Sequence, residues 1–173
     1  MNSPWCQIGN PDEVASPALL LWPDRVEHNV RRMVEIVEGQ AGHLRPHVKT
    51  HKLPQVLEMQ LAAGITCVKV ATIAEMEMAA EAGVPDVLLA FQPVGPNIRR
   101  LLDLGRKYPG ARISALVDDP GVVDSISSVF LAAGEVLPLY LDVDCGMHRT
   151  GIEVGEAALA VCGRVAELPG VEF

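Results

Sequence analysis

The sequence predicts an α/β protein in which helices cover a parallel β-sheet, either as a doubly wound open sheet or as a (β/α) barrel. Short apolar segments alternate strictly with longer segments of helical periodicity, in a repeat of about 20 to 30 residues. The expected strands are continuously apolar, as at 87–91 (VLLAF). Such strands are typical of a parallel sheet that is buried on both faces.

The first third of the chain contains two expected strands, each followed by an expected helix. A lead rich in proline and polar residues precedes a short buried strand at 17–22. Pro23 then favours the start of a helix that ends near Gly39, since proline is common at a helix start and glycine just past its end. A second strand is expected at 44–50 and a second helix at 54–64. The apolar positions of the first helix recur at helical spacing: Val26, Val30, Met33, Val34 and Val37.

From residue 66 onwards, strands and helices alternate without a linker or a second domain. Glycine follows almost every expected helix, where it favours the left-handed backbone that ends a helix. A turn is expected at 169–170, and one more strand is expected to begin just before Phe173. The remaining strands are expected at 66–72, 87–91, 113–117 and 137–143, and the remaining helices at 74–82, 97–107, 120–134 and 156–167.

The composition indicates one domain with an aliphatic core. At 173 residues the chain is long enough to bury a sizeable core. Apolar residues make up 49% and aromatic residues only 4%, so aliphatic side chains fill the interior. The net charge of -8 argues against nucleic acid or an anionic membrane as a partner. No apolar run approaches the roughly 20 residues that a membrane-spanning helix needs.

The N-terminus and the cysteines indicate a cytoplasmic protein. Residues 1–12 lack the basic start and the long apolar stretch of a secretory signal. The cysteines are widely spaced and form no CxxC pair, so we expect reduced thiols rather than disulfides or metal ligands. They are Cys6, Cys67, Cys145 and Cys162.

The segment 45–52 (RPHVKTHK) contains two histidines and two lysines within eight residues. Side chains alternate along a strand, so a strand here would place His47, Lys49 and His51 on one face. An amine between two imidazoles on one face indicates either an amine nucleophile or a metal site. Residues four apart in a strand lie roughly 13 Å apart, too far for one ion at about 2 Å per ligand. The strand geometry therefore favours the Lys49 amine, with a metal site at His47 and His51 as the alternative.

Polar side chains follow the expected strands at their C-terminal ends. In both parallel architectures this edge of the sheet is where ligands bind. The loop 144–151 (DCGMHRTG) follows the last full strand, so the charged groups around Lys49 and Arg149 are expected on the same rim. We interpret Asp118 and Asp119 as solvated loop charges. The polar residues at the strand ends are Lys49, Thr50, His51, Thr72, Gln92, Asp118, Asp119, Asp142 and Asp144.

Three segments together resemble the fold-type III pyridoxal-phosphate enzymes, the superfamily of alanine racemase. They are 17–21 (PALLL), 45–52 and 144–151, in the family's order. The resemblance is greatest to the branch of the D-threonine aldolases and D-serine dehydratases. It favours a (β/α) TIM-type barrel that is truncated after about six β/α units, since a closed barrel typically needs about 250 residues. The chain 1–173 would be a single N-terminal portion of an alanine-racemase-like barrel, with the C-terminal β-domain absent.

The resemblance implies a role for each candidate site residue. Lys49 would bind pyridoxal 5'-phosphate covalently and would be the catalytic residue. Arg149 would lie near the phenolic oxygen of the cofactor ring, and Asp144, in the same loop, is a further cofactor-binding residue. His47 and His51 would line the surroundings of the ring. The divalent metal of the full-length family would bind outside this chain, as would the cofactor's phosphate.

Two further residues are interpreted differently. Lys52 would fall on the opposite strand face from Lys49, so we interpret it as a surface lysine. Alanine racemases carry a tyrosine four residues after the cofactor lysine, whereas this sequence has Leu53. That difference makes racemase activity a poorer expectation. In the family, the strand at 17–22 belongs to the separate β-domain rather than to the barrel.

By this resemblance the expected function is that of a pyridoxal-phosphate-dependent lyase. It would cleave D-3-hydroxy amino acids, converting D-threonine to glycine and acetaldehyde. The first alternative is β-elimination, as in D-serine dehydratase or D-threo-3-hydroxyaspartate dehydratase. The second is an inactive partial barrel that self-associates through its open edge. The expected partners are a small D-amino acid and a second copy of the chain in a homodimer.

Overall fold

The computed structural model describes residues 7–173, so Cys6 lies outside the described part. Its sheet is parallel and follows the chain order β1-β2-β3-β4-β5. Cys67, Cys145 and Cys162 are free thiols. The strands are β1 (Cys67–Val70), β2 (Asp86–Leu89), β3 (Arg112–Val117), β4 (Leu137–Leu141) and β5 (Val171–Glu172). The helices are α1 (Pro23–Ile36), α2 (Pro54–Ala62), α3 (Ile73–Glu81), α4 (Pro96–Lys107), α5 (Pro120–Ala132) and α6 (Glu156–Glu167), with short 3-10 turns η2 (Pro11–Glu13), η3 (Ala41–His43) and η4 (Val48–Thr50).

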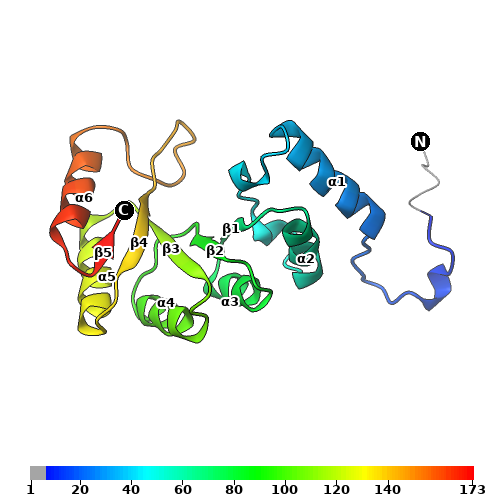
Figure 1. The fold of residues 1–173 in the computed structure, drawn as a ribbon, viewed down its shortest axis with the longest axis horizontal. Helices are drawn as coiled ribbons and strands as arrows, with labels where there is room; N and C mark the ends of the chain where they lie inside the picture. The colour runs from blue at the N-terminus through cyan, green and yellow to red at the C-terminus, as the bar shows by residue number, and fades with distance from the viewer. Residues whose placement is uncertain (1–6) are drawn as a thin grey trace.

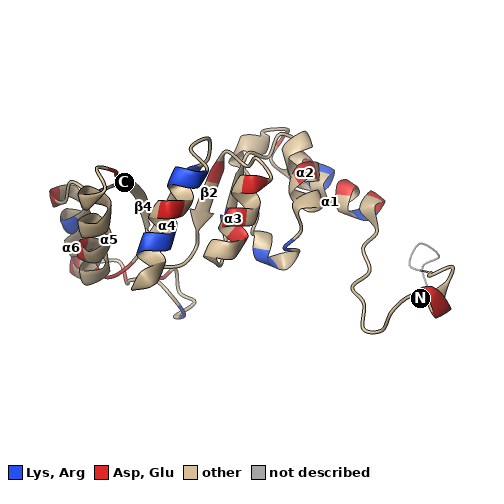
Figure 2. Ribbon diagram, turned by 90° about the horizontal axis from the view of Figure 1, so that it is seen from below, with Lys and Arg blue, Asp and Glu red and all other residues tan. Residues whose placement is uncertain are grey.

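The strand order confirms the barrel alternative. A doubly wound sheet reverses its strand order at a switch point, whereas here every strand pairs with its neighbour in sequence. Figure 2 shows helices α1 to α6 following one another in chain order along the molecule. Figure 1 shows residues 7–22, before α1, extending away from the rest of the fold. No helix within residues 7–173 is long and apolar enough to cross a membrane.

One face of the sheet packs against the helices and forms the core. The register aligns Val68 with Val87 and Val87 with Ile113, so side chains of three strands form one row. All three are at most 7% exposed and belong to one apolar cluster with residues of the helices. Aliphatic side chains therefore fill the interior between the sheet and the helices, as the sequence predicts.

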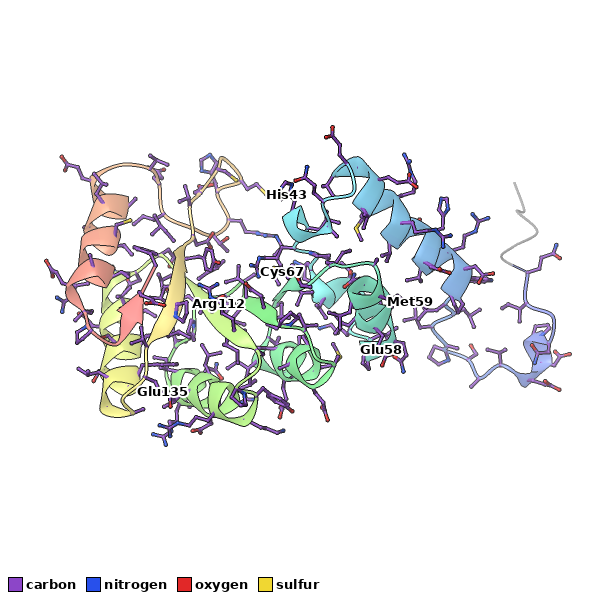
Figure 3. All side chains as sticks on the ribbon, in the orientation of Figure 1. His43, Glu58, Met59, Cys67, Arg112 and Glu135 are labelled. Atoms are coloured by element: carbon purple, nitrogen blue, oxygen red, sulfur yellow. The ribbon has the colours of Figure 1, made fainter. Side chains whose placement is uncertain are left out.

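The other face of the sheet is partly polar. Asp86 of β2 accepts a hydrogen bond from Arg45 at 2.6 Å and lies 3.6 Å from Arg112 of β3. Arg112, labelled in Figure 3, lies on the sheet. It also donates to the hydroxyl of Tyr140 on β4 at 3.2 Å. Leu88 and Ser114 on this face are also buried, whereas Arg112 and Tyr140 are exposed. The expectation of strands buried on both faces is thus met in full on the helix side and only in part on this side, where charged and polar groups link the strands.

Two expected strands are absent from the structure. Residues 18–22 have no regular secondary structure, and Leu19 is 81% exposed. A strand is stable only where another strand satisfies its backbone groups, and none lies beside this segment. The expected strand at 44–50 is reduced to a single parallel bridge between His47 and Lys69. The chain then turns at η4 instead of continuing as a strand.

Candidate active site

Lys49 lies in a tight turn, here called the Lys49 turn (residues 46–53), which is packed onto β1. The Lys69 N–H donates to the Pro46 carbonyl at 2.9 Å, which starts the turn beside the sheet. The N–H groups of His51 and Lys52 both donate to the Val48 carbonyl, at 3.1 and 2.9 Å. Val48 is fully buried and anchors the turn in the core.

The turn corrects the expected placement of the side chains. His47, Lys49 and His51 do not alternate along a strand, because the chain leaves the extended conformation after His47. Lys49 is exposed, and within residues 7–173 its ammonium forms no hydrogen bond or ion pair. Its backbone N–H donates to Nδ1 of His47 at 3.3 Å. The Lys49 amine is therefore exposed to solvent, just after the position where His47 pairs with the edge of the sheet.

Both histidines use Nδ1 to accept a backbone N–H. His47 accepts from Lys49, and His51 accepts from Leu53 at 3.1 Å, so each neutral ring carries its proton on Nε2. Burial lowers the pKa of His47, and the nearby charges of Lys49 and Lys69 lower it further. Burial also lowers the pKa of His51, whose Nε2 has no partner among the described atoms. These shifts favour neutral rings at neutral pH.

A metal site is the alternative raised for the two histidines. In a strand, the two histidines would lie too far apart for such a site. Because the segment forms a turn, that objection no longer applies. In the described part of the chain, no group of three or more His, Cys, Asp or Glu side chains is arranged to hold a metal ion. The Nδ1 atoms of both rings are engaged by backbone N–H groups, which leaves only Nε2 on each ring as a further donor.

Lys52 is a surface lysine, as expected, but it does not lie on the face of a strand. Its side chain is 61% exposed, but its ammonium is ion-paired with Glu75 of α3, whose side chain is only 5% exposed. Lys52 also has a left-handed backbone, with φ 53°. The expected placement was wrong because it assumed a strand. The turn brings Lys52 towards α3 instead.

Arg149 lies in the loop 144–151, here called the Arg149 loop, which follows β4. Asp144 organises the loop: its Oδ1 accepts from the N–H groups of Gly146 and His148, at 2.9 and 3.0 Å. Its other oxygen lies 2.9 Å from Nδ1 of His148. The hydrogen bonds from the N–H groups of His148 and Gly146 lower the pKa of Asp144 below its usual value. Asp144 thus shapes the loop, while Arg149 is exposed.

The Arg149 loop closes back onto the sheet at Gly151. The Gly151 N–H donates to the Asp118 carboxylate at 3.2 Å, and Ile152 donates to the Asp142 carbonyl at 2.9 Å. A Cβ at position 151 would lie 2.6 Å from the Asp144 nitrogen, so only glycine fits. Asp118 therefore holds the loop through a hydrogen bond and is not the solvated charge that was expected.

The same hydrogen-bond network reaches two neighbouring strand ends. The Gln92 side-chain carbonyl, beyond β2, accepts from the N–H groups of Asp118 and Asp119, at 2.9 and 3.2 Å. Asp119 in turn caps α5 by accepting from Val122 at 3.0 Å. The Asp-Pro pair at 119–120 is a sequence signal for such a cap. The contacts of Gln92 and Asp118 join segments far apart in sequence and carry no such signal.

The two charged regions share one rim but do not touch. Both follow the C-terminal ends of parallel strand positions. Three strands, β1 to β3, separate the His47 position from β4. At about 4.8 Å per strand this amounts to roughly 19 Å along the sheet, and barrel curvature shortens the direct path. No hydrogen bond or ion pair between described residues links the two regions.

A pocket of about 380 Å³ lies elsewhere on this edge, between the first turns of α3 and α4. Its lining includes Thr72, Phe91, Asn97 and Arg100 but neither Lys49 nor Arg149. The pocket lining contains no His, Lys, Cys, Asp or Glu side chain, whereas the Lys49 turn combines an exposed amine with two histidines whose pKa values are lowered. We therefore take the Lys49 turn, and not this pocket, as the centre of the candidate site.

Comparison with known proteins gives consistent matches. Residues 22–173 match the family "alanine racemase, N-terminal domain". The chain is 32% identical over 171 residues to the D-threonine aldolase of Arthrobacter sp, covering 98% of this chain and 45% of that protein. It is 31% identical over 144 residues to the D-threo-3-hydroxyaspartate dehydratase of Delftia sp. (strain HT23), covering 83% of this chain and 37% of that protein.

A solved structure matches as well. The D-threonine aldolase from Filomicrobium marinum superposes with a TM-score of 0.83 at 31% identity. The superposition covers 92% of this chain and 43% of that one. The chain therefore spans less than half the length of these relatives.

Proposed function

Because the chain belongs to the family of the alanine racemase N-terminal domain, we propose that it is the lysine-bearing portion of a pyridoxal-phosphate-dependent lyase. The family match confirms the resemblance inferred from the sequence. The observation that carries the proposal is the exposed Lys49 amine, which a turn anchored by the buried Val48 holds at the C-terminal rim of the sheet. The nucleophile is the neutral amine, and no ion pair with a described residue stabilises the ammonium form of Lys49.

Lys49 would be the catalytic residue, and the chemistry of the rim fits the cofactor. Lys49 would hold pyridoxal phosphate covalently through its side-chain nitrogen. When bound, pyridoxal phosphate supplies an electron sink for the charge that develops at the substrate Cα. His47 would line the ring, and its orientation is fixed by the Lys49 N–H, which donates to its Nδ1.

Arg149 would hold the cofactor from the opposite part of the rim. Its guanidinium is a permanent cation, which suits an anionic ring oxygen. Asp144 would contribute indirectly, because it binds the N–H groups of Gly146 and His148 and so fixes the loop that carries Arg149. Asp118 would support the same loop through Gly151.

The proposed substrates are D-3-hydroxy amino acids. Cleavage between Cα and Cβ of D-threonine would give glycine and acetaldehyde. The D-threonine aldolase relative favours this reaction. The dehydratase relative at 31% identity supports the second candidate, elimination of the β-substituent to give a keto acid and ammonia. Product analysis with D-threonine and D-serine separates the two, since only the first reaction releases glycine.

The experiment for Lys49 is covalent trapping. The chain is mixed with pyridoxal phosphate, reduced with borohydride and digested, and the labelled peptide is mapped by mass spectrometry. We expect the label on Lys49, its loss in Lys49→Ala, and its retention in Lys107→Ala, where an exposed lysine on α4 is removed. A label that maps to other lysines would contradict the proposal.

The proposed assembly is a homodimer. The partly polar face of the sheet opposite the helices and the incompletely paired edge of β4, where β5 pairs only with Leu137 and Pro138, leave surface for a second copy. Light scattering across a dilution series measures the assembly directly. A mass that stays at one chain over the whole series would contradict it.

A further inference from the structure

Glu75 is a buried carboxylate at the start of α3, next to the Lys49 turn. Its side chain is 5% exposed, and its Oε2 accepts the Ala71 N–H at 2.8 Å. Thr72 caps the same helix by accepting the Glu75 N–H at 3.1 Å. Glu75 is therefore rigidly held by the helix it belongs to.

The second oxygen of Glu75 binds Lys52, at the far end of the Lys49 turn. Burial disfavours the charged carboxylate, but the hydrogen bonds from Lys52 and from the Ala71 N–H outweigh it, and the pKa of Glu75 lies below its usual value. The ion pair joins residues 23 apart in sequence. It is the contact that ties the end of the turn to the sheet-and-helix framework.

The backbone of Lys52 explains why this contact matters. Its φ of 53° is the left-handed conformation that a lysine seldom adopts. The Lys52 N–H donates to Val48, so the left-handed residue closes the turn that contains Lys49. The ion pair with Glu75 holds the Lys52 side chain against α3 while its backbone is in this conformation.

We propose that Glu75 is a positioning residue for Lys49, acting through the Lys52 ion pair. The pair fixes the turn in the one conformation that presents the Lys49 amine towards the rim. This inference rests on the proposed function, in which Lys49 is the nucleophile. Glu75 does not itself reach the Lys49 amine, and its role is geometric.

The test compares two variants that break the ion pair between Lys52 and Glu75 with two matched controls. Glu75→Gln keeps an oxygen for the Ala71 N–H but loses the charge, and Lys52→Met loses the ammonium. Lys52→Arg keeps the pair. Glu77→Gln removes a different lysine pair, to Lys107, from the exposed side of the same helix.

Three quantities are measured on the full chain: the dissociation constant for pyridoxal phosphate, the site of borohydride labelling, and amide hydrogen exchange of His51 and Lys52. In Glu75→Gln and Lys52→Met we expect binding about tenfold weaker, because the apparent affinity falls with the fraction of molecules in the competent conformation. Exchange at the two amides should accelerate by a similar factor. Lys52→Arg and Glu77→Gln should match the wild type.

The outcomes separate the inference from the proposed function. Failure of the wild-type chain to label at Lys49 would contradict the proposed function, whereas the exchange measurement, which needs no cofactor, would still report on the turn. Unchanged exchange and affinity in Glu75→Gln, with only a lower melting temperature, would overturn the inference and leave Glu75 as a helix-capping residue.

Discussion

The Lys49 turn and the Arg149 loop lie on one rim but are held in different ways. The Lys49 turn depends on partners from other elements: a core position for Val48, an ion pair from Glu75, and a backbone bond from β1. The Arg149 loop is held largely by its own Asp144, which binds two N–H groups within four residues.

The two regions also differ in how deeply their apolar side chains are buried. Val48 is fully buried, whereas Met147, the large apolar residue of the Arg149 loop, is 71% exposed. The turn is therefore stabilised by packing as well as by charge, and the loop by hydrogen bonds and by the fit of Gly151. Substitutions should accordingly damage the two regions through different mechanisms, which the following predictions test.

The largest expected effect is in the Arg149 loop. Gly151→Ala would place Cβ 2.6 Å from the Asp144 nitrogen, on a backbone with φ 91°. We expect a loss of about 3 kcal/mol in the free energy of unfolding, measured by urea denaturation. Gly146→Ala is the control, because φ is 103° there but no atom lies within 4 Å of the added Cβ. Equal losses in both variants would show that backbone strain, and not close contact, dominates.

The next effect tests whether the Lys49 turn is anchored by packing. Val48→Ala removes two methyl groups from a fully buried site, with an expected loss of about 2 kcal/mol. Borohydride labelling of Lys49 should fall as well, because the turn loses its anchor. Val94→Ala, at a position 48% exposed, should change neither quantity. Normal stability of Val48→Ala would break the contrast between the two regions.

Asp144→Asn tests local capping in the Arg149 loop. An amide keeps one oxygen but is a weaker acceptor than the carboxylate and cannot pair with His148, so we expect a loss of about 1 kcal/mol. Calorimetry would measure it. Asp142→Asn is the matched control at the end of the same strand, where no side-chain hydrogen bond is formed within residues 7–173. A larger loss at Asp142 would contradict the assignment of Asp144 as the organiser of the loop.

The smallest expected effect is pH-dependent and belongs to the Lys49 turn. The pKa values of His47 and His51 are lowered by folding, so the unfolded chain binds more protons as the pH falls. The free energy of unfolding should therefore decrease below about pH 6.5, by about 1 kcal/mol or less for the pair.

The asparagine variants His47→Asn and His51→Asn keep an acceptor for the backbone N–H, and each should flatten this dependence in a thermal-melt series from pH 7.5 to about 5. A slope that is unchanged in both variants would show that other groups cause it. Below about pH 4, protonation of Glu75 and Asp144 should add a further loss, because the pKa of each is also lowered by folding.

The sequence by itself determined most of the fold and the location of the rim. The helix starts predicted at Pro23, Pro54 and Pro120 agree with the structure. Proline fits the first turn of a helix but not its interior, because its ring clashes with the preceding turn and it has no N–H to donate. The strands at β1 to β4 follow from apolar runs of the right length. Asp144 capping is local, within four residues, so the loop that carries Arg149 was also within reach of sequence reasoning.

Only the tertiary structure decided the shape of the Lys49 turn and its supports. The segment 44–50 has strand-forming residues, but packing of Val48 and the pair between Lys52 and Glu75 favour a turn. The Thr72-x-x-Glu75 pattern signals a helix start, yet nothing in it identifies Lys52 as the partner. Such contacts join positions 23 or more residues apart, as at Lys52 and Glu75 or, 33 apart, at Asp118 and Gly151. Their formation depends on how the strands align, and local backbone preferences contain no information about that alignment.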